Sequence, residues 1–246
     1  MFSKITQVGF EWEFMLWNQK SKKYIFPASV GFGHGDMPLL GEVRALPGQS
    51  PAEATGLFIQ SVCETRDRVM KLKHLELQCG YALITPEQYA EAMLHNRDKP
   101  IERNRNVYGT DILQLTDDVT ENNVRIGTHI SSGLHIHLSQ TEKYARRVNE
   151  TTIEDIRPLL TITQMSRLVK QLDKKLLPKY PTRAASWLAV SSTAMPVNLK
   201  YRQPGFWDIK AHGGFEYRSL PMLTDMFNVD TIHDISKVCF NLLHKL

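Results

Sequence analysis

Four short segments of the chain each carry two ionisable side chains separated by a single apolar or aromatic residue. The pairs are Glu11 with Glu13, Glu42 with Arg44, His135 with His137, and Glu216 with Arg218. In a β-strand, side chains two residues apart leave the same face, so each pair is expected to share one face of a strand. Carboxylates and imidazoles together favour a divalent metal ion, and arginines beside them favour phosphate. The spacing therefore predicts one shared site for a metal ion and a phosphate group.

The alternative for each pair is a place on the solvent face of a half-buried strand. For a single pair this is the simpler explanation, because the polar face of an alternating strand normally points to water. Solvent faces usually carry Thr, Lys, Ser and Gln, however, whereas all eight positions of the four pairs hold Glu, Arg or His. The four pairs taken together favour a common face of one sheet.

Apolar alternation predicts the strands that position these pairs. Strands are expected at residues 5–17, 24–30, 39–46, 133–139 and 215–220. The glycine-rich residues 31–36 form a loop that would let a phosphate approach the backbone closely. They match neither the dinucleotide-binding nor the P-loop spacing, so a plain connector is the alternative.

Helix-start signals and apolar periodicity predict four helices. The clearest start is Ser50, a capping residue followed by Pro51 at the first helical position and Glu53 three residues after the cap. The helices are expected at residues 51–73, 85–95, 152–177 and 231–244. In the third helix Lys170, Lys174 and Lys175, with Lys179 beyond it, are expected to form a solvated basic face. A stripe that binds nucleic acid by base stacking would have aromatic residues between its cations, and few stand among these.

Two long segments, 96–128 and 178–214, show no clear periodicity. Most connections in compact domains run only about 4–6 residues, so segments of this length are usually functional or disordered. The first is rich in Arg and Asn, and it is either a substrate-binding flap or a basic excursion without chemistry. The second contributes Arg202 and Lys210, which precede the last predicted strand.

Length and composition place the chain among single-domain proteins of a reducing compartment. With 246 residues and 42% hydrophobic content, it is long enough to bury a sizeable core, and we expect one domain over residues 1–246. The formal charge of +4 fits an anionic substrate as well as weak nucleic-acid affinity. Three cysteines without a Cys-x-x-Cys pair argue against a disulfide framework or a zinc ribbon. No apolar run approaches the roughly 20 residues that span a bilayer, so we expect a cytoplasmic protein without membrane contact.

The four pairs also resemble the motifs of a known superfamily. Gly133-Leu134-His135-Ile136-His137 resembles the Gly-x-His-x-His signature of the glutamine synthetase superfamily, and Phe215-Glu216-Tyr217-Arg218 resembles its Glu-x-Arg strand. The opening strand around Glu11 and Glu13 and the segment Gly41-Glu42-Val43-Arg44 agree with two further motifs. Their order and the short chain most resemble the carboxylate-amine ligase type 2 proteins (amidoligases) found in bacteriophages. The resemblance covers residues 8–221 through motifs separated by unmatched loops.

This resemblance implies an α+β fold in which an antiparallel sheet curves into a partial barrel backed by helices, as in the glutamine synthetase catalytic domain. It implies metal ligands at Glu11, Glu13, Glu42, His135 and Glu216. It places His137 at the nucleotide phosphates and Arg218 at the transferred phosphoryl group, with Glu13 and Glu42 as catalytic carboxylates. Arg44, Arg202 and Lys210 are implied contacts for phosphate or carboxylate groups. Lys210 stands where the family often has Arg, and Lys offers no bidentate fork.

The implied activity is ATP-dependent ligation of a carboxylate to an amine, with Mg²⁺ or Mn²⁺ as the metal. ATP would phosphorylate the carboxylate to an acyl phosphate with release of ADP, and the amine would displace phosphate to form an amide or peptide bond. The substrates are expected to be a small-molecule amine and a carboxylate, among them an amino acid, a peptide, a cell-wall fragment or a modified nucleobase. For a phage-encoded chain the compartment would be the host cytoplasm, and the oligomeric state is open.

Three alternatives compete with the ligase. A cupin-type metalloprotein would use His135, His137 and Glu142 in its metal motif, but would need a Gly where His129 stands and short strands where a long helix is expected. A protein that binds nucleotide or nucleic acid without catalysis would have little reason to keep so many carboxylates buried together. A guanidino kinase would require a Cys in the arginine-rich connections, and these contain none.

Overall fold

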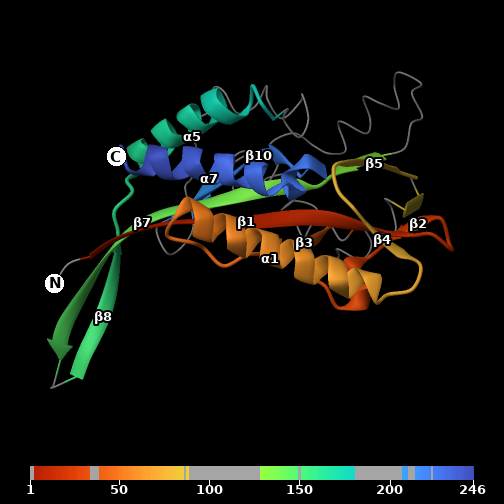
Figure 1. The fold of residues 1–246 in the computed structure, drawn as a ribbon, viewed down its shortest axis with the longest axis horizontal. Helices are drawn as coiled ribbons and strands as arrows, with labels where there is room; N and C mark the ends of the chain where they lie inside the picture. The colour runs from red at the N-terminus through yellow and green to blue at the C-terminus, as the bar shows by residue number, and fades with distance from the viewer. Residues whose placement is uncertain are drawn as a thin grey trace.

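The computed structural model describes residues 3–33, 39–85, 87–88, 128–148, 151–180, 207–209, 214–222 and 224–246. These residues form an α+β protein in which helices pack on an antiparallel sheet, as expected (Figure 1). The predicted Arg202 and Lys210 contacts, most of the segments 96–128 and 178–214, and most of the expected helix 85–95 lie outside the described residues. Among the described helices, none combines the length and the apolar character that a membrane crossing requires.

The long strands β1 (Ser3–Asn18) and β7 (Gly133–Val148) are the centre of the sheet. The strand order is β2-β1-β7-β10-β9, where β2 is Lys23–Ile25, β9 is Trp207–Ile209 and β10 is Phe215–Pro221. Two further strands, β3 (Gly41–Arg44) and β4 (Leu75–Gln78), pair with β1. All of these pairings are antiparallel, and the sheet is open rather than closed among the described strands. A separate pair joins β5 (Tyr81–Ile84) to β6 (Thr128–Ser131).

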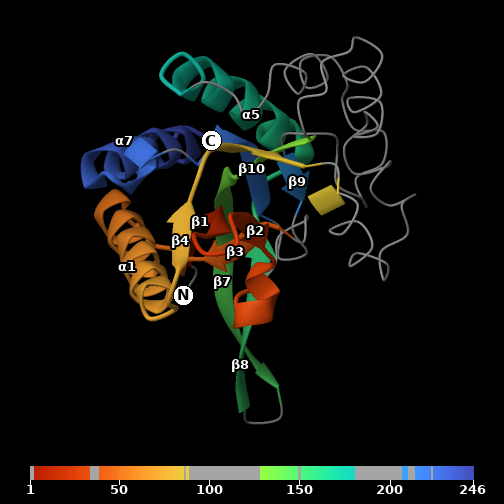
Figure 2. The same cartoon turned by 90° about the vertical axis from the view of Figure 1, so that its right-hand side faces the viewer.

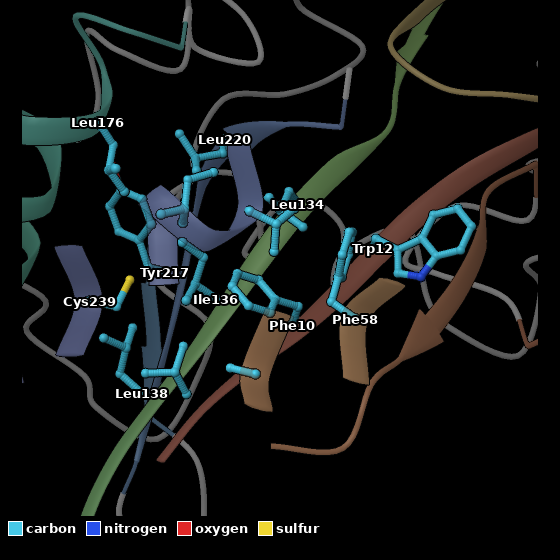
Figure 3. Close-up of a cluster of buried hydrophobic side chains, with 14 of the residues drawn as sticks. Phe10, Trp12, Phe58, Leu134, Ile136, Leu138, Leu176, Tyr217, Leu220 and Cys239 are labelled. Atoms are coloured by element: carbon cyan, nitrogen blue, oxygen red, sulfur yellow. The ribbon is translucent and has the colours of Figure 1, made fainter. Parts of the chain in front are cut away.

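One face of the sheet is covered by the three helices α1 (Pro51–Met70), α7 (Val229–Leu243) and α5 (Ile162–Leu176), in that spatial order (Figures 1 and 2). Apolar side chains from alternate positions of the central strands meet the helices in the core. Figure 3 shows this cluster, formed by Phe10 and Trp12 of β1, Leu134, Ile136 and Leu138 of β7, Tyr217 and Leu220 of β10, and Phe58, Leu176 and Cys239 of the helices. Strand alternation therefore leaves the ionisable pairs on the opposite face.

The region 152–177 corrects the sequence analysis, which predicted one helix there. Residues Thr151–Pro158 instead form strand β8, which pairs with the second half of β7 and projects from the body as a hairpin (Figure 1). The β-branched Thr151, Thr152 and Ile153 favour a strand, and Pro158 is incompatible with a helix interior. The helix begins only at Ile162, where Thr161 and Gln164 form a capping box.

The other differences between the predicted and the observed elements also have local causes. The predicted strand 24–30 ends at Ile25, because Pro27 lacks a backbone N–H and starts the short 3₁₀-helix Pro27–Val30, which Gly31 ends with a φ of 83°. The predicted strand 39–46 is limited to β3. The segment 178–214 contains β9, which the sequence analysis assigned to a connection. Strands β4, β5 and β6 were not predicted, since four-residue strands carry little periodicity.

The start of α1 confirms its cap and reveals a tightly packed glycine. Ser50 Oγ accepts a hydrogen bond from the backbone N–H of Glu53 at 3.2 Å. Just before the cap, Gly48 exchanges two backbone hydrogen bonds with Val8 of β1, at 3.0 and 2.9 Å. A Cβ atom on Gly48 would collide with the backbone of Ala54, with Ala54 Cα at 2.7 Å. The close approach of α1 to β1 therefore depends on the absence of a side chain at this position.

We expect Gly48→Ala to destabilise the fold by about 1–3 kcal/mol, the range for inserting atoms into a packed interior. The matched control is Gly56→Ala on the exposed side of α1, where an added Cβ has nothing within 4 Å. Since Ala is the better helix former, the control should be stabilised by up to about 1 kcal/mol. Urea unfolding of both variants measures the difference. Equal effects at the two positions would contradict the packing described here.

Candidate metal centre

The sheet register brings the four predicted pairs together. Glu11 of β1 lies directly opposite His135 on β7 and Arg44 on β3. His137 likewise lies opposite Glu216 on β10. Directly opposed residues of antiparallel strands share a face, so segments separated by more than a hundred residues in sequence contribute to one cluster. All four pairs are thus neighbours.

The centre of this cluster consists of Glu11, His135 and Glu216. One ligand atom from each lies within 4.8 Å of the others, a spacing that fits one metal ion. His135 Nδ1 is 2.9 Å from Glu216 Oε1 and 3.5 Å from Glu11 Oε1. All three residues are almost fully buried, with at most 2% of their surface exposed. Two carboxylates and one imidazole are a donor set suited to Mg²⁺ or Mn²⁺, so the residues fit the metal that the sequence predicted.

Glu13 is beside the centre and has a second contact. Its Oε2 accepts a hydrogen bond of 2.7 Å from the backbone N–H of Gly133, and the same oxygen is 4.0 Å from His135 Nε2. Gly133 follows Ser132, which is fully buried and accepts a hydrogen bond of 2.7 Å from the backbone N–H of Gly80. Sequence analysis missed these backbone contacts, although the Ser-Gly pair before the histidine strand marks a tight junction. Glu13 therefore connects the centre to the start of β7.

Two arginines flank the carboxylates, in different surroundings. Arg44 Nε is 2.8 Å from Glu11 Oε2, and its Nη2 is 2.8 Å from Glu42 Oε1, yet 68% of its side chain is exposed. Arg218 is buried, and its Nε is 3.3 Å from Glu216 Oε1. The register of β10 shifts after Tyr217, so two residues of β10 stand opposite His135. Such bulges redirect side chains next to functional sites, and this one carries Arg218.

Burial and close charges perturb the acidic groups in opposite directions. Burial favours the neutral form of Glu11, but hydrogen bonds from His135 and His137 outweigh it and hold the pKa of Glu11 well below its usual range. Burial and the negative charge of Glu11 raise the pKa of Glu42 to about 7. Burial and Arg218 oppose the protonation of His135, but Glu11, Glu216 and Glu13 raise its pKa overall. The metal-free centre therefore attracts positive charge, which is the property that a cation site requires.

In chelator, Glu42→Gln should raise the melting temperature near pH 8 and leave it almost unchanged near pH 4. The folded-state pKa of Glu42 lies above its ordinary value of 4.5, so the folded chain binds this proton more tightly than the unfolded chain. That stabilisation is fully present below about pH 4.5 and is lost as the pH rises through about 7. Gln imitates the protonated form at every pH. The measurement is thermal unfolding across this pH range, with the exposed Glu64→Gln as the control. A change in melting temperature on Glu42→Gln that is the same at every pH would contradict the prediction.

The remaining predicted residues lie around this centre or outside the described chain. His137 Nε2 is 3.0 Å from Glu11 Oε2, and 23% of its side chain is exposed. Its expected contact with nucleotide phosphates, like the other assigned roles, stays a prediction. Asp208 of β9 lies opposite Glu216 in the register, a position that sequence analysis missed because it assigned this segment to a connection.

The geometry also bears on the cupin alternative. Glu142 pairs with Lys4 in the sheet register, seven residues along β7 from His135. Its carboxylate accepts a hydrogen bond of 2.7 Å from Arg157 Nη2. At about 3.3 Å per residue, seven positions of a strand separate Glu142 from His135 by roughly 23 Å. Although strand β8 removes the earlier objection based on a long helix, Glu142 is too distant to complete a cupin metal motif.

Comparisons of the chain with protein-family models, with curated proteins and with solved structures give no match. The geometry of the centre and its donor chemistry are therefore the basis for the function proposed below.

Proposed function

We propose that this protein is an ATP-dependent carboxylate-amine ligase whose metal centre is built on Glu11, His135 and Glu216. The observation that carries the proposal is the buried convergence of these three side chains from β1, β7 and β10 within 4.8 Å. Leaving several ionisable groups in a protein interior is costly unless they are paired or bind a metal. Their order along the chain is also that of the ligase motifs. The proposal includes a glutamine synthetase-like curvature of the sheet into a partial barrel.

The donor set supports phosphoryl transfer. Mg²⁺ and Mn²⁺ prefer oxygen ligands, and when bound between carboxylates and a nucleotide they neutralise phosphate oxygens. The burial of Arg218 beside Glu216 supports a role for its guanidinium in stabilising negative charge that develops on the transferred group. Arg44, which is mostly exposed and close to Glu11 and Glu42, is placed to attract an anionic substrate.

Glu42 is the best placed of the carboxylates for proton transfer. In the metal-free protein its pKa is about 7, in the range suited to accepting a proton from an attacking ammonium group at neutral pH. Both carboxylates have one oxygen engaged, but Glu13 is held by the buried backbone of Gly133, whereas Glu42 contacts the mostly exposed Arg44. We therefore assign the general base to Glu42, and to Glu13 the task of holding the strand that carries both histidines.

Calorimetric titration of the protein with ATP, in the presence of Mg²⁺ and then in chelator, tests this proposal. We expect binding with Mg²⁺ and none without it. Mixtures of amines and carboxylates, drawn from amino acids, short peptides and modified nucleobases, are then screened for ADP release that requires both partners. Absence of ATP binding with either Mg²⁺ or Mn²⁺ would rule out the ligase.

One observation favours a second candidate. His137 lies 3.0 Å from Glu11, so His135, His137 and Glu11 provide two imidazoles and one carboxylate. This combination with open positions is typical of non-haem iron sites. Elemental analysis of the purified protein distinguishes the candidates, because bound iron together with a failure to bind ATP would support a redox or hydrolytic metal site.

A further inference from the structure

Helix α5 presents a face on which every exposed charged side chain is cationic. The exposed charged residues are Arg167, Lys170, Lys174 and Lys175, which we call the cationic face. Arg167, Lys170 and Lys174 fall within one stripe of the helix at axial steps of about 4.5 and 6 Å. Like charges three or four residues apart destabilise a helix by a few tenths of a kcal/mol per pair, so the arrangement has a cost.

Nothing in the described part of the chain neutralises this face. The only acidic residue of α5, Asp173, points inward and accepts a hydrogen bond of 2.8 Å from the hydroxyl of Tyr217 on β10. None of the ion pairs among the described residues involves the four cations. The face contributes four positive charges, equal to the formal net charge of +4 of the whole chain. With Asp173 included, helix α5 has a net charge of +3, so a short element of the chain carries a strong local excess of positive charge.

The position and composition of the cationic face limit the kind of partner that it can bind. Helix α5 is at the outer end of the helical layer, and that layer covers the sheet face opposite the metal centre (Figures 1 and 2). The apolar residues of α5 whose side chains the structure describes, Met165, Leu168, Val169, Leu172 and Leu176, are buried in the core, so none of these is available to enter a lipid bilayer. No aromatic side chain stands among the cations, which excludes the base stacking used for single strands. The charged groups of this face therefore favour a partner that is recognised by its negative charge.

We propose that the cationic face of α5 binds the phosphate backbone of double-stranded nucleic acid without sequence preference. A duplex carries closely and regularly spaced phosphates along its axis, and Lys and Arg contact them without reading bases. A straight row of cations on a rigid helix follows one such strand. The sequence pattern alone favoured a solvated face, because aromatics are absent. That absence argues against stacking on unpaired bases but not against contacts to a duplex backbone.

The test is a binding titration of a short mixed-sequence duplex by fluorescence anisotropy at several salt concentrations. Three phosphate contacts, from the stripe of Arg167, Lys170 and Lys174, predict a slope of log affinity against log salt of about −2.7. The variant Lys170→Gln/Lys174→Gln should bind on the order of 10- to 100-fold more weakly and show a slope closer to zero by about 1.8. The control Lys20→Gln/Lys23→Gln removes the same charge from exposed lysines of the β1–β2 turn and should bind like the unmodified protein.

Each of the other outcomes overturns the proposal. An equal loss of duplex affinity in both double variants would show a general charge effect. An absence of duplex binding at low salt would show that the face is solvated. Binding of anionic phosphatidylserine vesicles in place of the duplex, with the same loss in the α5 variant, would assign the face to a membrane surface. Neither double variant should lower the melting temperature or change the Mn²⁺ affinity, so an absence of duplex binding would not count against the proposed metal centre.

Discussion

Glu216→Gln is expected to weaken Mn²⁺ binding by more than about 100-fold, because it removes one of the three proposed ligands, which converge in the centre. Changes to residues that merely orient ligands already cost 10- to 100-fold in metal affinity, and a direct ligand should cost more. The amide keeps the shape of the side chain but loses the negative charge, and Glu216 Oε1 is the carboxylate oxygen closest to His135 Nδ1, at 2.9 Å. Calorimetry or electron paramagnetic resonance of free Mn²⁺ measures the change.

A matched control separates ligand loss from general effects. Glu142→Gln removes a carboxylate from β7, but one that is engaged with Arg157 outside the centre. It should bind Mn²⁺ like the unmodified protein. The metal-free Glu216→Gln protein should remain folded by circular dichroism, because the substitution also relieves repulsion between buried carboxylates. Unchanged Mn²⁺ affinity in folded Glu216→Gln would exclude Glu216 from the metal site.

Arg218→Lys is expected to lower the rate of ADP formation by about 100- to 1,000-fold while leaving the affinity for Mg²⁺ and ATP within a few-fold. Loss of a single group that stabilises transition-state charge typically has an effect of this size on kcat. Lysine retains the charge but replaces the planar fork with a point charge on a flexible stem. Because Arg218 is buried against Glu216, its guanidinium has a defined orientation that lysine does not reproduce.

The measurement is steady-state kinetics with the amine and carboxylate that support ADP release. Arg157→Lys, an exposed change beside Glu142, is the control and should leave kcat unchanged. A larger effect on the KM for ATP than on kcat would place Arg218 in ground-state binding instead. Equal rates for Arg218→Lys and the unmodified protein would remove Arg218 from the proposed catalytic machinery.

Alternation within the central strands made much of the layout predictable. The apolar and ionisable residues of β1, β7 and β10 divide between two faces, and this depends only on positions two residues apart. The prediction of a helix over residues 152–158 was wrong because it also depended only on local spacing. Ile156 and Leu159 continue the helical spacing of the α5 core residues, and only the hairpin pairing of β8 with the preceding strand β7 decides for a strand. Pro158 was the available signal.

Some features of the candidate site were likewise predictable from the sequence, and others were not. Residue types and spacing predicted which side chains would gather, since Glu, His and Arg at strand positions are uncommon on a solvent face. They did not predict that Glu13 binds the backbone of Gly133, that Arg44 is exposed while Arg218 is buried, or that Asp208 stands in register with Glu216. These features depend on strand register and on a bulge in β10, which are set by contacts between distant segments.

The long sequence separation of the metal ligands also bears on when the centre forms. Glu11, His135 and Glu216 lie on three strands that become neighbours only after most of the chain has been synthesised. Contacts of such high sequence separation form late, because the entropy of closing large loops must first be overcome. A nascent chain that ends before β10 has at most two of the three ligands. The proposed metal ion would therefore bind a sheet whose central strands have already assembled.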